Sequence, residues 1–235
     1  MVGIALSNNV VLMLDFWELT SLSSFLLIGF WRHKAEARQG ARMALAVTGG
    51  GGLALIAGML LLGQAAGSFE LATILTRGAI VQASPLYAPA LLLILLGAFT
   101  KSAQFPFHFW LPHAMAGSAS LHSATMVKAG VSLLARLWPV LAGTDLWFAL
   151  VATTGLVTMI FGAAIALFRS DLKAILAYST ISQLGLMVML LGFATPAAAA
   201  AAVFHILNHA AFKAALFMNA GIADHETGTR DIRRL

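Results

Sequence analysis

The sequence contains no cysteine, and only 10% of its 235 residues are charged. The lack of cysteine excludes disulfides, zinc sites built on thiolates and cysteine-ligated iron-sulfur clusters, and it leaves the redox compartment undetermined. The shortage of charge, together with 60% hydrophobic residues, is typical of a chain that lies in a membrane. The first residues, MVGIALSNN, also lack the basic start of a signal peptide.

The apolar residues fall in blocks of about 20, the length that a helix needs to cross the hydrocarbon of a bilayer. They predict an all-α polytopic membrane helix bundle with about seven transmembrane helices. The expected spans are 9–31, 43–66, 89–112, 119–141, 147–168, 174–194 and 197–222. Residues 32–42, RHKAEARQGAR, are expected to form a charged loop, and 67–88 a connection that includes a short amphipathic helix at the membrane surface. No linker or repeat divides the chain, so 1–235 is expected to be a single transmembrane domain.

The basic residues indicate an orientation. With the end of the first span in the cytoplasm, nine loop cations lie inside, against Arg77 alone on the other side. These nine are Arg32, Lys34, Arg38, Arg42, Arg169, Lys173, Arg230, Arg233 and Arg234. The net charge of +5 does not indicate nucleic acid, because the basic residues are spread among short loops without an interleaved aromatic patch.

Three lysines, Lys101, Lys128 and Lys213, lie inside apolar stretches. An intramembrane lysine costs about 2.5 to 3.5 kcal/mol on insertion scales, so such residues usually face one another, water or an ion path. Glu18 lies mid-span, with Asp15 one turn earlier, and Lys101 is its natural counter-charge. Burial favours the neutral forms of Glu18 and Lys101, whereas proximity favours the charged forms, so a change in their separation would move a proton. A static ion pair that joins two helices is the alternative.

Two further motifs fit a proton path. Lys101 begins KSAQFPFHFWLP, and Pro106 predicts a broken or kinked helix there, next to a hydrated site or as a simple proline kink. His205, His209 and Lys213 recur every four residues, so they share one helical face and can relay protons. Packing histidines are the alternative, and no metal site is expected because cysteine and nearby carboxylates are lacking.

His122 and Lys128 in LHSATMVKAG lie on largely opposite helical faces, where they can connect neighbouring polar clusters along the membrane plane. The run GGGG at 49–52 follows no strand and precedes no phosphate-binding lysine. It therefore predicts close helix packing rather than nucleotide binding.

Five motifs in one order closely resemble the large subunit of Mrp-type or Pha-type cation/proton antiporters, which is similar to the proton-pumping, antiporter-like subunits of respiratory complex I. They are FWELTSLSSFLLIGFW, KSAQFPFHFWLPHAMA, LHSATMVKAG, SDLKAILAYSTISQLG and HILNHAAFKAALFMNAGIADHETGTRDIRRL. The resemblance implies that Glu18 and Lys101 form a working pair, and that His122, Lys128 and Lys213 belong to a central polar axis.

The resemblance further implies a hetero-oligomer with other antiporter subunits in a bacterial inner membrane, exchange of protons for Na⁺ or K⁺, and no cofactor. The chain looks like a middle piece of a longer subunit. It reads AMAGSASLHSATM where the family reads AMAAPTPVSAYLHSATM, and this shorter segment is expected to shift His122 relative to Lys101. Two other functions stay open: a proton-pumping subunit of an NADH-quinone oxidoreductase or membrane hydrogenase, and a non-transporting remnant or scaffold.

Overall fold

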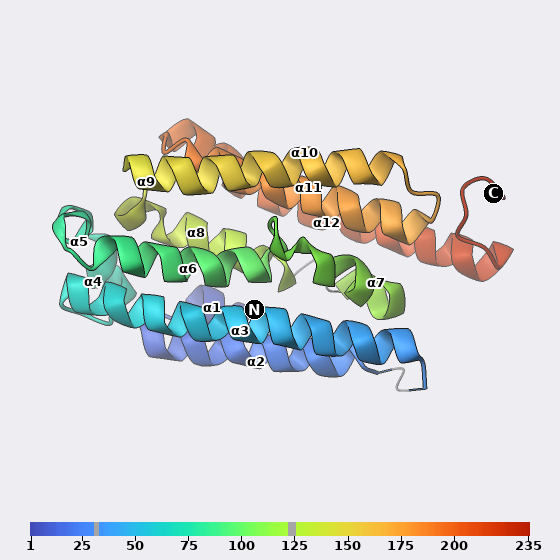
Figure 1. Ribbon diagram of the computed structural model, residues 1–235, viewed down its shortest axis with the longest axis horizontal. Coiled ribbons are helices and arrows are strands. Elements are labelled where there is room, and N and C mark those ends of the chain that lie inside the picture. The colour runs from blue at the N-terminus through green and yellow to red at the C-terminus, as the bar shows by residue number, and fades with distance from the viewer. Residues whose placement is uncertain (31–32, 122–125) are drawn as a thin grey trace.

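The computed structural model describes residues 1–30, 33–121 and 126–235, without the side chains of 116–121. Its long helices run side by side along the longest axis of the molecule (Figure 1). The elements are α1 (Val2–Leu6), α2 (Val10–Ile28), α3 (Ala35–Ala66), α4 (Leu71–Leu75), α5 (Gly78–Ala83), α6 (Tyr87–Lys101), η1 (Phe107–Phe109), α7 (Trp110–Leu121), α8 (Lys128–Leu141), α9 (Asp145–Trp147), η3 (Phe148–Ala152), α10 (Thr153–Leu167), α11 (Leu172–Gly192) and α12 (Pro196–Thr227).

The predicted all-α membrane bundle is confirmed. Five helical segments in the described ranges are long and apolar enough to cross a membrane: α2, α3, the run from α9 through α10, α11 and α12. The shorter apolar helix α6 is the first half of the broken third span. In Figure 1, α2 and α3 lie along one edge, α10, α11 and α12 lie along the other, and α6, α7 and α8 lie between them.

The expected loop at 32–42 is wrong for most of its length, because α3 begins at Ala35. Alanine, glutamate, arginine and glutamine all favour helix, and they outweigh the single unfavourable residue, Gly40. At 32 residues, α3 is about 48 Å long, more than the roughly 30 Å of hydrocarbon. Its first turns therefore project beyond the apolar layer, so that their charged side chains reach water while the segment remains helical.

The fourth span also differs from its prediction. Residues 119–121 end α7 rather than begin the next helix, and α8 begins only at Lys128. Pro112, Gly117 and Ser118 interrupt the apolar run and predicted a connection at 113–118, but α7 continues through it, so the second half of the broken helix was assigned too short.

The connection 67–88 contains two short helices, α4 and α5, where one was expected. Their buried residues Leu71, Ile74 and Val81 join the main hydrophobic core, so these helices cover one end of the bundle. Gln82 Nε2 donates to the carbonyl oxygens of Val140 and Ala142, at 2.9 and 3.0 Å. These bonds satisfy carbonyls at the end of α8 that have no helical partner.

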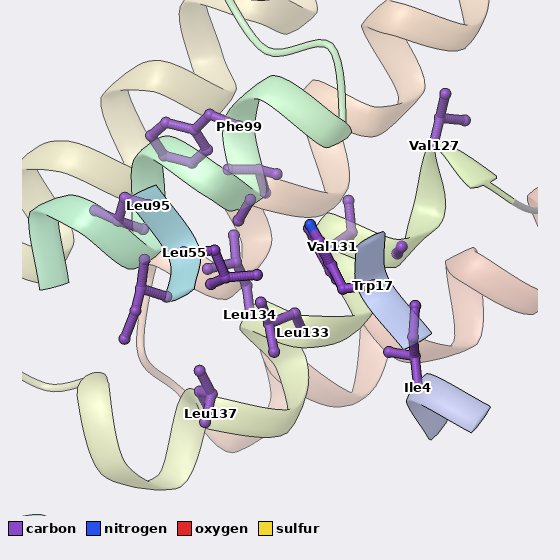
Figure 2. Close-up of a cluster of buried hydrophobic side chains, with 14 of the residues drawn as sticks. Ile4, Trp17, Leu55, Leu95, Phe99, Val127, Val131, Leu133, Leu134 and Leu137 are labelled. Carbon is purple, nitrogen blue, oxygen red and sulfur yellow. The ribbon is translucent and has the colours of Figure 1, made fainter. Parts of the chain in front are cut away.

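Helix α8 forms the centre of the core. Figure 2 shows its Val131, Leu133, Leu134 and Leu137 among apolar side chains from α1, α2, α3 and α6. Since apolar side chains gain little by leaving lipid, close fit rather than water exclusion holds such helices together.

Glycines allow that close fit between α10 and α11. A Cβ at Gly155 would lie 2.3 Å from the backbone nitrogen of Met189, and one at Gly185 would lie 2.5 Å from that of Met159. The two backbones therefore touch directly, as small residues permit in membrane bundles.

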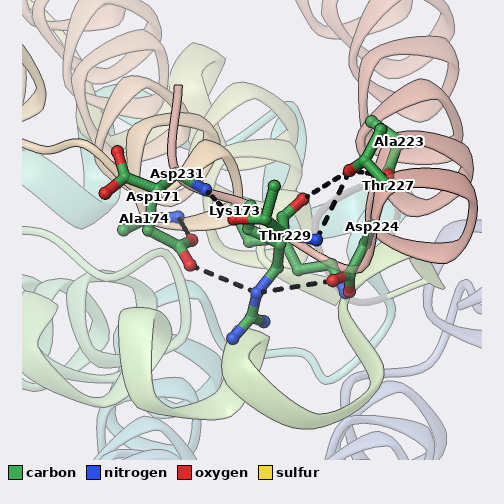
Figure 3. A network of polar contacts seen from close by, with 9 residues as sticks. Asp171, Lys173, Ala174, Ala223, Asp224, Thr227, Thr229 and Asp231 are labelled. Atoms are coloured by element: carbon green, nitrogen blue, oxygen red, sulfur yellow. Dashed lines mark hydrogen bonds and ion pairs between the residues drawn. The ribbon is translucent and has the colours of Figure 1, made fainter. Parts of the chain in front are cut away.

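A polar network ties the start of α11 to the end of α12 (Figure 3). Lys173 Nζ lies 2.9 Å from Asp224 Oδ2, and Arg230 Nε lies 3.2 Å from Asp171 Oδ2. Beyond α12, hydrogen bonds from Arg233 lower the pKa of the Asp231 carboxyl. Figure 1 shows the start of α3, the α10–α11 connection and the C-terminus at one end of the bundle. Most of the loop cations therefore lie at the same end of the bundle, as the sequence predicts.

Candidate functional site

The predicted break at Pro106 is confirmed. Helix α6 ends at Lys101, and helical structure resumes at Phe107. Ala103 has a φ of +49°, a left-handed conformation that side chains disfavour. Neighbours satisfy polar groups around the break: Phe105 N–H donates to Thr158 Oγ1 (2.9 Å), and Trp110 Nε1 donates to the Thr100 carbonyl (2.9 Å). Non-helical backbone at this depth is stable because surrounding protein supplies such partners.

Lys101 lies at the edge of this break and is completely buried. Its Nζ donates to Ser21 Oγ at 2.6 Å and to the Trp17 carbonyl at 3.3 Å, both on α2. The ammonium also lies 5.1 Å from the centroid of the Trp17 ring, within range of a cation–π interaction. A hydroxyl, a carbonyl and a ring face thus surround this amine.

Glu18 lies next to these partners on α2 and interacts with Lys101 through its charge. The described part of the chain shows no ion pair within 4.0 Å between them, because Lys101 Nζ bonds to Ser21 and Trp17 instead. Glu18 Oε1 is buried and has no hydrogen-bond partner among the described residues. Glu18 and Lys101 are therefore neighbours without direct contact, and the static ion pair is not formed in this structure.

The glycine run predicted to pack closely does so around this pair. A Cβ at Gly52 would lie 1.8 Å from Glu18 Oε1, and one at Gly51 would lie 1.8 Å from Thr100 Oγ1. Helix α3 thus presents bare backbone to the carboxylate on one side and to the last turn of α6 on the other. The prediction of close helix packing at 49–52 is confirmed for these two positions.

The gap between α6 and α8 is also narrow and polar. A Cβ at Gly130 would lie 2.1 Å from Ser102 Oγ and 2.2 Å from the Ala98 carbonyl oxygen. Ser102 Oγ and Gln104 Oε1 are buried without a hydrogen-bond partner among the described residues. Because most buried polar atoms are hydrogen-bonded, two such atoms next to Lys101 mark the helix break as a polar site inside the bundle.

Lys128 is the first residue of α8, two positions before Gly130, and only 4% of it is exposed. Its charge interacts with those of His209 and Lys213 on α12, a helix that contacts α8. Two buried ammonium groups within electrostatic range repel each other, so protonation of one disfavours protonation of the other.

The predicted stripe on α12 is present. His209 is fully buried, Lys213 is 2% exposed, and His205 is half-buried, on one face of the helix. The rings of His205 and His209 lie 6.1 Å apart between centroids. Neither ring nitrogen of His209 has a hydrogen-bond partner among the described residues. The stripe therefore faces the protein interior rather than lipid.

Two residues that sequence reasoning missed bind this stripe from α11. Lys213 Nζ donates to Ser179 Oγ, and His205 Nε2 is hydrogen-bonded to Gln183 Oε1 at 2.6 Å. Ser179 and Gln183 are four residues apart, so they form a second polar stripe facing the first. That spacing, within AYSTISQLG, was the available sequence signal.

Two further candidates from the sequence are His122 and Asp15. His122 lies outside the described residues. The expected shift of His122 relative to Lys101 therefore stays a prediction. Asp15 is exposed and lines, with Glu18 and Ser21 on α2 and Leu45 on α3, a groove of about 500 Å³. Among the described residues no three metal-binding side chains gather, so His205 and His209 lack a third ligand.

The described site residues form a row across the bundle. Glu18 on α2 is followed by Lys101 on α6, Lys128 on α8, and His209 with Lys213 on α12. Helices α6 and α8 contact each other, and so do α8 and α12. Chemically, the row offers groups that can take up and release protons, and charges interact within two parts of it, between Glu18 and Lys101 and among Lys128, His209 and Lys213.

Residues 7–235 match the family described as NADH:quinone oxidoreductase/Mrp antiporter, transmembrane. The chain belongs to this family. It is 62% identical over 239 residues to the A/B component of a probable K⁺/H⁺ antiporter of Rhizobium meliloti, and 50% identical over 253 residues to the A component of a Na⁺/H⁺ antiporter of Alkalihalophilus pseudofirmus. All of the chain is covered, but only 24% and 31% of these relatives. These names describe transporter subunits rather than catalytic enzymes.

Family members of known structure share the fold. The Mrp complex of Dietzia sp. DQ12-45-1b matches 97% of the chain and 26% of its own chain, with a TM-score of 0.92 and 43% identity. An archaeal membrane-bound sulfane sulfur reductase matches 99% of the chain and 49% of its own chain, with a TM-score of 0.89 and 26% identity. The chain is thus a multi-pass membrane protein of the antiporter family, and it spans about a quarter to a third of the antiporter relatives.

Proposed function

We propose that residues 1–235 form a proton-translocating transmembrane unit of a multisubunit Na⁺ or K⁺/H⁺ antiporter in a bacterial inner membrane. The observation that carries this proposal is Lys101, a completely buried amine at a helix break that is held by a hydroxyl and a carbonyl rather than by a carboxylate. Desolvation of an ammonium is costly, so its protonation responds to small changes in the surroundings.

Protonation of Lys101 alternates in this mechanism, and Glu18 gates it. When the Glu18 carboxylate approaches, the charged lysine is favoured, and when it withdraws, the lysine releases its proton. Ser21 and the Trp17 carbonyl hold the amine in place between these states. The missing Cβ at Gly52 provides the space that the carboxylate occupies in this position.

The released proton passes through His122 and Lys128 toward His205, His209 and Lys213. Repulsion between the charges of Lys128 and Lys213 prevents both from holding a proton with equal ease, so a proton that arrives at one promotes release from the other. The partners are the other antiporter subunits, with protons and Na⁺ or K⁺ as the transported ions, and no cofactor takes part.

A second candidate function is a proton-pumping subunit of a redox-driven complex, such as an NADH-quinone oxidoreductase or a membrane hydrogenase. The likeness to the archaeal sulfane sulfur reductase supports it, since the same helices occur there in a respiratory complex. Its 26% identity, against 43 to 62% for proteins named as antiporter or Mrp components, favours the antiporter.

The test uses a chimaera in which this chain replaces the matching segment of the Rhizobium meliloti relative. Inverted vesicles from cells that lack other antiporters are given a pH gradient, and its collapse is followed after addition of NaCl or KCl. We expect one of the two salts to collapse the gradient. Proton flux that requires a respiratory donor and ignores both cations would favour the redox-driven complex, whereas assembled chimaera with no flux would favour a non-transporting scaffold.

A further inference from the structure

A hollow between the end of α2 and the start of α3 combines cationic and apolar walls. It has a volume of about 300 Å³ and is lined by Phe25, Leu26, Gly29, Arg38, Ala41 and Arg42. The hollow exists because the two helices meet through small residues: a Cβ at Gly29 would lie 3.5 Å from that of Ala41. Longer side chains on either side of this contact form the walls.

Arg38 and Arg42 are one turn apart on α3, so their side chains lie on the same helical face. Both are exposed. The acidic residue of this first stretch, Glu36, is two positions before Arg38 and therefore lies on the opposite side of the helix. The two guanidinium groups thus share a positively charged face of α3 with Lys34, one turn before Arg38.

The apolar part of the hollow comes from the last turns of α2. Leu26 is 57% exposed, and Phe25 is half-buried. These residues lie within a segment apolar enough to cross a membrane, whereas Arg38 lies among the charged residues in the first turns of α3, a helix longer than the hydrocarbon is thick. The hollow therefore lies across the boundary between hydrocarbon and headgroups.

We propose that this hollow binds one anionic phospholipid. Guanidinium groups bind phosphate oxygens in a bidentate manner, and basic pockets between transmembrane helices suit anionic headgroups. Phe25 and Leu26 supply the apolar contact for an acyl chain. A bound lipid would tie the start of α3 to α2, and α3 is the helix whose glycines face Glu18 and Thr100.

The absence of cysteine allows a direct test. Leu22 lies one turn before Leu26 and is 50% exposed, so a fluorophore on Leu22→Cys reports on lipid beside the hollow without filling it. Ile160→Cys on α10 is the matched control, because Ile160 is 58% exposed and lies about as far from the same end of its helix. The labelled chain is placed in vesicles containing either brominated phosphatidylglycerol or brominated phosphatidylcholine, and quenching is compared.

We expect brominated phosphatidylglycerol to associate about tenfold more strongly than phosphatidylcholine near position 22, with little preference near position 160. Arg38→Gln with Arg42→Gln should abolish the preference, and Arg38→Lys with Arg42→Lys should retain part of it. Three results would overturn the proposal: equal quenching by both lipids at position 22, the same preference at position 160, or a preference that survives the double glutamine variant. Light scattering and elution volume confirm that each variant remains folded.

Discussion

At the scale of single residues, the hydroxyl of Ser21 explains how a lysine is kept inside the bundle. It accepts a hydrogen bond from Lys101 Nζ at 2.6 Å, while Glu18 stays out of contact. The sequence predicted the pairing of Glu18 with Lys101 from their shared depth, but hydrogen-bond partners depend on rotation about α2. Helix periodicity alone places Glu18, Ser21 and Trp17 on one broad face and does not choose among them.

On α12, too, helix periodicity predicts a shared face but not the hydrogen-bond partners. The spacing of His205, His209 and Lys213 predicted a shared face, which is confirmed. Their partners Ser179 and Gln183 come from another helix, where their spacing predicts a shared face but not which helix that face contacts. Identifying Ser179 and Gln183 as partners requires the contact between α11 and α12, which the spacing within one helix does not give.

Removal of the hydroxyl that binds Lys213 should slow proton transfer. Ser179→Ala leaves the Lys213 ammonium with one fewer buried acceptor, and a positioned transfer group contributes about 10²- to 10⁴-fold. In the chimaera we expect a loss of flux of at least about tenfold, with recovery in Ser179→Thr, which retains the hydroxyl. Full flux in Ser179→Ala would show that the bond is only structural.

Gly52 offers a way to move the carboxylate without removing it. Because a Cβ there would lie 1.8 Å from Glu18 Oε1, Gly52→Ala should displace the end of a flexible side chain and leave the helices in place. We expect cation-dependent flux to fall while the melting temperature changes little. Gly50→Ala is the control, since a Cβ at Gly50 would meet no atom within 4 Å. In this variant neither the cation-dependent flux nor the melting temperature should fall. Equal flux in both variants would contradict a gating role for Glu18.

At the scale of elements, the contact between α10 and α11 should be the least tolerant of added volume. A methyl group at Gly155 would meet backbone atoms, which cannot rotate away, at 2.3 and 2.7 Å. We expect Gly155→Ala to destabilise the protein by about 1 to 3 kcal/mol. In Gly50→Ala, by contrast, the higher helix propensity of alanine should add about 0.5 to 1 kcal/mol. Thermal unfolding in detergent measures both, and an unchanged midpoint in Gly155→Ala would mean that the helices separate easily.

Helix existence was predictable, and helix ends were not. Hydropathy found every long apolar helix, because no polar backbone can face lipid unpaired. It missed that α3 begins at Ala35, since charged residues of good helix propensity can extend a helix into water. It also shortened α7, because Pro112, Gly117 and Ser118 are typical of a helix end but lie within this helix. The break at Pro106 was predictable from covalent geometry, since proline lacks the amide donor.

At the scale of the whole molecule, the charge distribution predicts which end faces the cytoplasm. Gln39 on the projecting part of α3 and Gln64 near its other end are both exposed and lie about 38 Å apart along the helix. In intact cells, an impermeant thiol reagent should label Gln64→Cys but not Gln39→Cys, and permeabilisation should allow labelling of both. The reverse pattern would overturn the orientation derived from the loop cations.

The row of a carboxylate, amines and imidazoles across four helices is the feature on which the proposed function depends, and Lys101 is completely buried within it. The most direct test is the cation-dependent collapse of a pH gradient in vesicles that contain the chimaera with Lys101→Ala. We expect at least about a 100-fold loss of flux, with normal assembly, because no other group occupies this position in the path. Lys173→Ala, which removes a lysine from the ion pairs at the end of the bundle, should retain most of the flux. Undiminished, cation-dependent exchange in assembled Lys101→Ala would contradict the proton path.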